Sequence, residues 1–328
     1  MTKFFDFTKN IAKESVAVYW ALIKIIIPVM IVVEIGIRYG LVDVLSDWSA
    51  PFMAVFGLPA EASLILVTTI LVGLYPAAAV LITLAPEVAF TTADMTILGG
   101  MMLFAHVLPV EQMIVKKTGV SIVFSTFIRL LAMVIYGWLS YLILDAFVLF
   151  KEPANILISM DAGSGEPKTW GEWALSSVQG LAMIFVILVG LILLIKLLDI
   201  SGITKRLIKW LTPVLRLIGI GPNAAPLAMV GILLGLSFGG GLIIREVEKG
   251  QLQPKSVFLS MIFICLGHSL IEDTLIILAC GGHWSGIFVG RILLSFAMII
   301  PIALMIKPMP DKIFYRFFYK MKKPAPAI

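Results

Sequence analysis

Residues 257–280 read Val257-Phe-Leu-Ser-Met-Ile-Phe-Ile-Cys-Leu-Gly-His-Ser-Leu-Ile-Glu-Asp-Thr-Leu-Ile-Ile-Leu-Ala-Cys280. This run has the length that a membrane-spanning helix needs, about 20 residues. Its centre, however, is the polar stretch Gly267-His-Ser-Leu-Ile-Glu-Asp-Thr274. Ionisable side chains in hydrocarbon are costly and usually mark a pathway, a binding site or an internal ion pair. The run therefore predicts a spanning segment that is interrupted near the membrane midplane and carries functional groups there.

The rest of the chain is apolar as well. Of its 328 residues, 60% are hydrophobic and 14% are charged, whereas soluble domains have about half apolar and a quarter charged residues. This composition excludes a water-soluble enzyme and predicts a multi-pass membrane protein. Five more long apolar runs and two runs broken by Gly or Pro complete the pattern: Val16–Gly36, Ile97–Ile114, Val120–Leu144, Val178–Ile195 and Gly286–Ile306, then Ala62–Ala85 and Ala224–Ile244.

The chain contains an internal duplication. When it is shifted against itself by 162 positions, unusual residues fall into register without a gap. Two of the three histidines match each other, and so do two arginines within apolar runs, which composition alone does not explain. The matched pairs are Trp48 with Trp210, Pro51 with Pro213, Gly57 with Gly219, Gly73 with Gly235, His106 with His268, Glu111 with Asp273, Gly119 with Gly281, and Arg129 with Arg291.

Each half is expected to contain the same parts in the same order. A long spanning helix is followed by an amphipathic helix, at Val42–Phe56 in one half and Thr204–Ile218 in the other. The next segment contains Gly73-Leu-Tyr-Pro76 or Gly235-Leu-Ser-Phe-Gly239-Gly-Gly. Each glycine inside a helix costs about 1 kcal/mol relative to alanine, so these segments are predicted to be re-entrant hairpins covered by protein. A discontinuous spanning helix and a continuous one complete each half.

Positive charge predicts the topology, because cytoplasmic loops are rich in Lys and Arg. Basic loops face the cytoplasm throughout only if both broken segments are hairpins. Each half then crosses the membrane three times, and the halves are inverted relative to each other, as in many secondary transporters. The fold class is thus an all-α membrane protein with two inverted repeats and both termini cytoplasmic. The predicted domains are residues 1–148, an extracytoplasmic loop 149–175, the second repeat 176–308 and a basic tail 309–328.

Polar and charged residues are expected to converge where the discontinuous helices face the hairpin tips. His106 and His268 lie about 12–18 Å deep when counted at ~1.5 Å per residue. They could form a substrate and coupling-ion site, or they could be satisfied core residues. Arg129 and Arg291 could pair with acids across each half or bind an anion. The candidate substrate or coupling-ion residues are His106, Glu111, Asn223, Ser237, Gly239, Gly240, His268, Ser269, Glu272 and Asp273.

The second half is the more polar one, since Ser269 and Glu272 stand where the first half has Val107 and Val110. Because Glu272 and Asp273 are adjacent acids, repulsion between them favours proton uptake. We therefore expect proton coupling to depend on Glu272 more than on Glu111. No compact Cys/His cluster, nucleotide loop or hydrolase motif is visible, so we expect no metal, no cofactor and no enzymatic activity. Cys265 and Cys280 lie in apolar sequence and are expected to be buried thiols rather than a disulfide.

The second-half motifs resemble the "nucleoside recognition" or Gate-domain membrane proteins. The resemblance rests on the hairpin Gly-Leu-Ser-Phe-Gly-Gly-Gly241, on Gly267-His-Ser-Leu-Ile-Glu-Asp-Thr274, and on Gly281 and Arg291. It covers most of 40–140 and 200–305. That group is similar to concentrative nucleoside transporters, to the channel part of ferrous-iron permeases and to spore-maturation membrane proteins. The resemblance implies a transporter-like fold. The nucleoside transporters bind ribose and base with Asn, Gln and Glu, which the hairpin tips of this chain lack.

The sequence favours a secondary transporter in a bacterial cytoplasmic membrane. Its solute would be small and polar or anionic, coupled to protons through His268, Glu272 and Asp273. Two alternatives remain: a divalent metal-ion permease, in which Cys265 could take part, and a non-transporting membrane scaffold of a larger assembly. The expected partners are the lipid bilayer, the solute or ion, and further copies of the chain. The basic tail fits a cytoplasmic membrane surface better than nucleic acid.

Overall fold

The computed structural model describes residues 2–85, 87–157, 169–202, 223–236 and 252–320, together with residues 206, 209, 213–216, 218–221, 243–247 and 249. This part of the chain is almost entirely helical, and its β-structure is limited to two isolated bridges. The helices up to residue 146 are α1 (Thr2–Arg38), α2 (Leu41–Ala54), α3 (Ala62–Leu71), α4 (Leu74–Leu84), α5 (Thr92–Ala105), α6 (Leu108–Lys117) and α7 (Ile122–Ala146). The later ones are α8 (Trp170–Ile200), α10 (Ala225–Leu234), α12 (Pro254–Gly267), α13 (Glu272–Ala279), the π-helical turn η1 (Ser285–Gly290), α14 (Arg291–Ile306) and α15 (Asp311–Phe317).

Among the residues that the structure describes, six helical segments are long and apolar enough to cross a membrane, and they coincide with the six apolar runs predicted from the sequence. They are Ile11–Arg38, Thr92–Lys117, Ile122–Ala146, Trp170–Leu194, Pro254–Ala279 and Ser285–Ile306. The predicted all-α membrane fold is confirmed.

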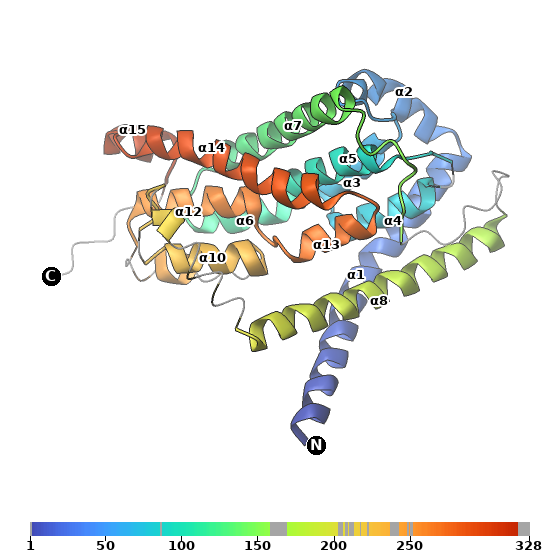
Figure 1. Ribbon diagram of the computed structural model, residues 1–328, viewed down its shortest axis with the longest axis horizontal. Coiled ribbons are helices and arrows are strands. Elements are labelled where there is room, and N and C mark those ends of the chain that lie inside the picture. The colour runs from blue at the N-terminus through green and yellow to red at the C-terminus, as the bar shows by residue number, and fades with distance from the viewer. Residues whose placement is uncertain are drawn as a thin grey trace.

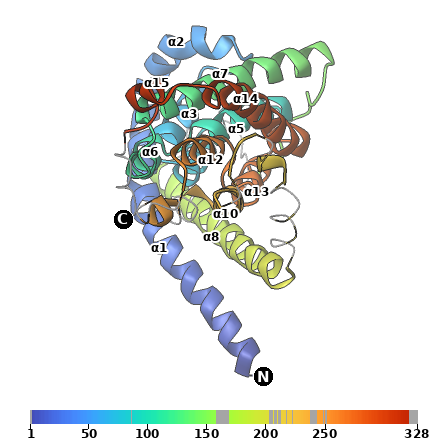
Figure 2. The same ribbon diagram turned by 90° about the vertical axis from the view of Figure 1, so that its left-hand side faces the viewer.

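The spanning segments differ in how far the protein covers them. In the most apolar part of the broken pairs α5–α6 and α12–α13, 78% and 72% of residues are buried, against 12% in α1 and 24% in α8. Figures 1 and 2 show α5 and α12 near the middle of the bundle, and α1 extending beyond it towards the N terminus. Apolar side chains such as Trp20 and Val32 on α1 are exposed, as lipid contact requires. The interrupted helices are therefore kept away from lipid.

The predicted breaks occur where Gly, Pro and polar residues interrupt the apolar runs. The two short helices α3 and α4 contact each other and are separated at Gly73. Helices of 10 and 11 residues reach about 15 Å, half the thickness of the hydrocarbon core, which suits a re-entrant hairpin. In the second half α10 ends at Gly235, but the predicted return arm begins in residues 237–242, outside the described part of the chain. The amphipathic segment Val42–Phe56 is helical in α2, whereas most of Thr204–Ile218 lies outside the described residues.

The backbone repeats with the spacing seen in the sequence. All eight described glycines with positive φ form four pairs 162 residues apart: Gly40 with Gly202, Gly57 with Gly219, Gly73 with Gly235, and Gly119 with Gly281. Helices α5 and α12 begin and end at equivalent positions. The halves differ at the breaks between α5 and α6 and between α12 and α13. Helix α13 starts two residues later than the register of α6 predicts. Local geometry was thus duplicated together with sequence, except near Ser269–Ile271.

The contacts of two equivalent turns support the predicted inversion. The turn at Gly119 binds the C-terminal segment, where the Lys320 amide donates to the Gly119 carbonyl at 2.8 Å. The equivalent turn at Gly281 lies against the loop after α7, where the Leu157 amide donates to Ala279 at 2.9 Å. These turns therefore lie at opposite ends of α7. Two halves of the same orientation would place them at the same end, so the inversion across a membrane stays a prediction that this arrangement favours.

Candidate functional site

The site forms where α5 and α12 end, at the two matched histidines. His106 and His268 leave the helical conformation, with ψ of 152° and 166°, and the next residues, Val107 and Ser269, adopt φ of 47° and 48°. A β-branched residue in this left-handed region is strained, so the surrounding structure must hold it there. The hairpin glycines lie directly against these turns. A Cβ atom at Gly73 would sit 2.8 Å from Val107, and one at Gly235 would sit 2.7 Å from Ser269.

The two histidine rings face each other with their Nε2 atoms 2.8 Å apart. Each Nδ1 lies next to a backbone carbonyl of its own helix, at 3.2 Å from Met102 and 3.0 Å from Ile264. A carbonyl only accepts, so we assign a proton to each Nδ1, which leaves a neutral ring with a lone pair at Nε2. Two lone pairs would repel at this distance. With these tautomers, a single proton shared between the two Nε2 atoms would remove the repulsion.

Acids from both halves surround the histidines crosswise. Glu111 Oε1, from the first half, lies 2.8 Å from His268 Nε2 of the second half. Asp273 Oδ2, from the second half, lies 3.5 Å from His106 Nε2 of the first. All four residues are buried. Each histidine therefore lies next to a carboxylate of the opposite half, and these four side chains connect the two halves.

The buried arginines bind the carbonyl groups that the broken helices leave without intrahelical partners. Arg129 donates to Phe104 O at 2.8 Å and His106 O at 2.7 Å, and its Nη1 forms an ion pair with Glu111. Arg291 donates to His268 O at 2.8 Å, while its Nη2 lies 3.9 Å from Asp273 Oδ2. The predicted pairing within each half is confirmed, tightly in the first and loosely in the second. Aspartate is one methylene shorter than glutamate, which explains the difference.

Glu272 links the second half to the first hairpin. The Tyr75 hydroxyl, on α4, donates to Glu272 Oε1 at 3.1 Å. The sequence placed Tyr75 at the hairpin tip but did not identify it as a site residue. Its polar end beside Pro76, in an otherwise apolar segment, was the available signal.

An open cavity of about 230 Å³ joins these groups. Ser269 lines it, as predicted, together with the four residues of the crosswise cluster and Glu272. Asn223 does not line this cavity. It is exposed just before α10, whose other end reaches the cavity, and a helix of 10 residues is about 15 Å long. Ser237, Gly239 and Gly240 lie outside the described residues.

The structure also assembles a donor set that the spacing of the sequence concealed. Ligand atoms of His106, His268 and Asp273 all lie within 4.8 Å of one another, although these residues are not clustered in the sequence. Imidazole and carboxylate donors suit a first-row divalent metal ion. Cys265 does not belong to this set: it is buried and accepts a hydrogen bond from Ser125 at 3.5 Å. His283, the third histidine, stacks on Phe150 and is not part of this set.

Comparison with known proteins agrees with this geometry. Residues 181–284, which contain α10, α12, α13 and the His268 break, match the family model described as Gate, nucleoside recognition. This part of the chain is thus similar to the Gate, or nucleoside recognition, family. A membrane protein of Bacillus subtilis (strain 168), described as uncharacterized membrane protein YvoD, is 28% identical over 266 residues, which cover 80% of this chain and 83% of that protein. No solved structure matches the chain. The matched Gate region ends before Arg291 and includes only the second of the two histidines.

Proposed function

We propose that this protein is a proton-coupled transporter of a small polar or anionic solute, placed in the cytoplasmic membrane with both termini in the cytoplasm. The observation that carries the proposal is the contact between the two histidine Nε2 atoms at 2.8 Å. With a proton on each Nδ1, the lone pairs of the two Nε2 atoms meet there, and a shared proton would join the rings. The contact also joins the two halves, since each ring ends a broken helix of its own half.

The charges around the histidines favour a proton at this contact. The cluster contains the buried carboxylates of Glu111 and Asp273, the half-buried carboxylate of Glu272, and the buried guanidinium groups of Arg129 and Arg291. One shared proton leaves the cluster neutral, whereas a divalent ion leaves an excess positive charge. Uncompensated charge is expensive in a low-dielectric interior. The proton would move between His106 and His268 or leave through the open cavity beside Glu272.

The position of the cluster fits alternating access. It lies near the middle of two candidate spans, Thr92–Lys117 and Pro254–Ala279. Transporters place solute and coupling ions near the midplane, where the ends of discontinuous helices meet. The Tyr75–Glu272 hydrogen bond connects a hairpin of the first half with the second half. A change in the protonation of the site could therefore change the relative position of the two halves.

Proteoliposomes that contain a pH-sensitive dye test this proposal. Pools of nucleosides, amino acids, carboxylates and phosphates are added outside, and we expect one pool to acidify the lumen through the native protein. His106→Gln and His268→Gln keep hydrogen-bonding groups but cannot titrate, so each should abolish the dye response while the protein stays folded. An unchanged response in both variants would refute the role of the histidine pair.

The same vesicles address a second candidate function, a divalent metal-ion permease, which the His106–His268–Asp273 donor set supports. In that case Zn²⁺, Fe²⁺ or Mn²⁺ enters without any organic solute, and the histidine variants block the entry. A folded protein that moves neither solutes nor metal ions would instead support a scaffold.

A further inference from the structure

The two matched arginines differ in how completely their donors are satisfied. Arg129 uses Nε, Nη1 and Nη2 in contacts with Phe104, Glu111 and His106. Arg291 is equally buried, yet its Nε and Nη1 have no hydrogen-bond partner among the described residues. A buried donor without a partner costs about 1–3 kcal/mol, and more when it is charged. Among the described residues, Arg291 therefore retains two nitrogens without a hydrogen-bond partner, whereas every side-chain nitrogen of Arg129 has one.

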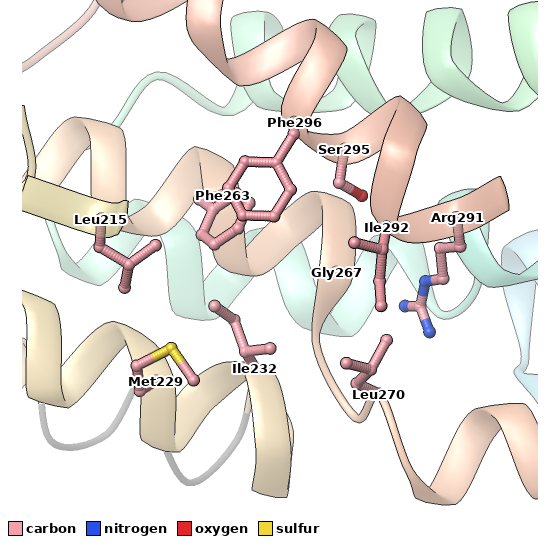
Figure 3. Close-up of a pocket in the computed structure, with 10 residues that line it drawn as sticks. All are labelled: Leu215, Met229, Ile232, Phe263, Gly267, Leu270, Arg291, Ile292, Ser295 and Phe296. Carbon is pink, nitrogen blue, oxygen red and sulfur yellow. The ribbon is translucent and has the colours of Figure 1, made fainter. Parts of the chain in front are cut away.

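A separate apolar cavity lies next to these free donors. Its volume is about 60 Å³, and it is lined by residues of α10, α12 and α14 together with Leu215 and Leu270. Figure 3 shows the Arg291 guanidinium at one end, directed past Ile292 and Leu270, while Met229, Ile232 and Phe263 line the other parts. Ser295 supplies the other polar side chain, and its hydroxyl already donates to Leu266 O at 3.2 Å. The cavity thus has apolar walls, and the buried Arg291 guanidinium lies at one end of it.

The Arg291 guanidinium and the apolar walls together limit which molecules could bind in the cavity. A water molecule needs two to four polar partners, which walls of Met, Ile, Leu and Phe do not supply. Phosphate would place several charged oxygens in an apolar space with a single guanidinium group. A carboxylate has two oxygens in a plane that matches the guanidinium group, and an aliphatic tail suits the walls. The volume exceeds the ~10–15 Å³ required for one water but limits the tail to a few carbon atoms.

We propose that this cavity is a subsite for a short-chain aliphatic carboxylate, with the carboxylate on the free N–H groups of Arg291 and the chain against α10 and Phe263. The inference rests on the proposed transport function and narrows its solute to a class. Asp273 sets the subsite up, because its short side chain leaves Arg291 incompletely paired. Glutamate at the equivalent position 111 reaches Arg129 and leaves no such donor.

Equilibrium binding to purified protein in nanodiscs tests the subsite without any gradient. Radiolabelled butyrate is the probe, and butyramide, chloride and inorganic phosphate are the competitors. Saturable butyrate binding is expected, with butyramide at least tenfold weaker because it lacks the charge. Ile232→Trp fills the cavity and should weaken butyrate binding at least tenfold. Ile70→Trp, at the equivalent position of the first half, is the matched control and should leave binding unchanged.

Asp273→Glu gives a second test that adds no bulk to the cavity. The longer acid should occupy Arg291 as Glu111 occupies Arg129, so butyrate binding should fall at least tenfold in a protein that is folded. Non-saturable binding, equal competition by butyramide, full competition by chloride or phosphate, or indifference to both variants would each overturn the subsite. Proton-coupled flux of another solute without butyrate binding would overturn the subsite alone. Butyrate binding without gradient-driven flux would overturn the transport proposal alone.

Discussion

The ion pair between Arg129 and Glu111 allows a quantitative test of how the broken helix α5–α6 is held together. Arg129→Ala removes the charge that compensates Glu111 and also leaves the carbonyls of Phe104 and His106 without their donor. Breaking a buried pair costs about 3–5 kcal/mol, and each orphaned buried acceptor adds about 1–3 kcal/mol. We therefore expect Arg129→Ala to lower the free energy of unfolding by at least ~4 kcal/mol. Glu111→Ala should cost about 3 kcal/mol, since it leaves the arginine still bonded to both carbonyls.

The double variant separates pairing from carbonyl binding. Arg129→Ala with Glu111→Ala leaves no unpaired charge but keeps both carbonyls orphaned, so it should recover a coupling energy of about 1–3 kcal/mol. The matched cycle in the second half, Arg291→Ala with Asp273→Ala, should give a smaller coupling because that contact is 3.9 Å long. Unfolding in mixed micelles of increasing SDS fraction, followed by tryptophan fluorescence, measures all variants. A coupling near zero in the first half, or a larger one in the second, would refute the reasoning.

Three further predictions concern topology, hairpin packing and coupling. The first test uses a protein that lacks Cys265 and Cys280. In it, Asn155→Cys and Lys320→Cys should react with impermeant maleimide from opposite sides of the membrane, because inverted halves place these exposed positions at opposite ends of α7. Labelling of both positions from the same side would contradict the topology. Gly73→Ala should destabilise the protein by about 2 kcal/mol or more. The reason is that φ of Gly73 is 129° and the new Cβ would lie 2.8 Å from Val107. The matched control is Gly190→Ala on α8, where nothing lies within 4 Å of the new Cβ. It should be neutral or stabilising by about 0.5–1 kcal/mol. Equal thermal stability of Gly73→Ala and Gly190→Ala would show that glycine is not required at position 73. Glu272→Gln should reduce the response of solute flux to an imposed pH gradient at least tenfold, whereas Val110→Ala at the equivalent first-half position should not; a full response in Glu272→Gln would show that this acid does not couple.

The sequence by itself determined the membrane class, the six spans, the places where helices break and the 162-residue register. These properties depend on local composition: hydropathy decides which segments enter the bilayer, and Gly, Pro and polar residues decide where backbone hydrogen bonding stops. The pairing of Arg129 with Glu111 was also predictable, since both residues lie on neighbouring helices joined by a short turn at Gly119.

Only the tertiary structure decided how the two halves meet. The histidine pair, the contact of Glu111 with His268 and that of Asp273 with His106 join residues far apart in the chain, and no periodicity specifies which ends of two broken helices will touch. The Tyr75–Glu272 hydrogen bond and the position of Asn223 outside the polar cavity both depend on which end of a hairpin reaches the midplane. The unsatisfied donors of Arg291 follow from a difference of one methylene group between Asp273 and Glu111. Such a difference matters only once packing has fixed the distance between two helices.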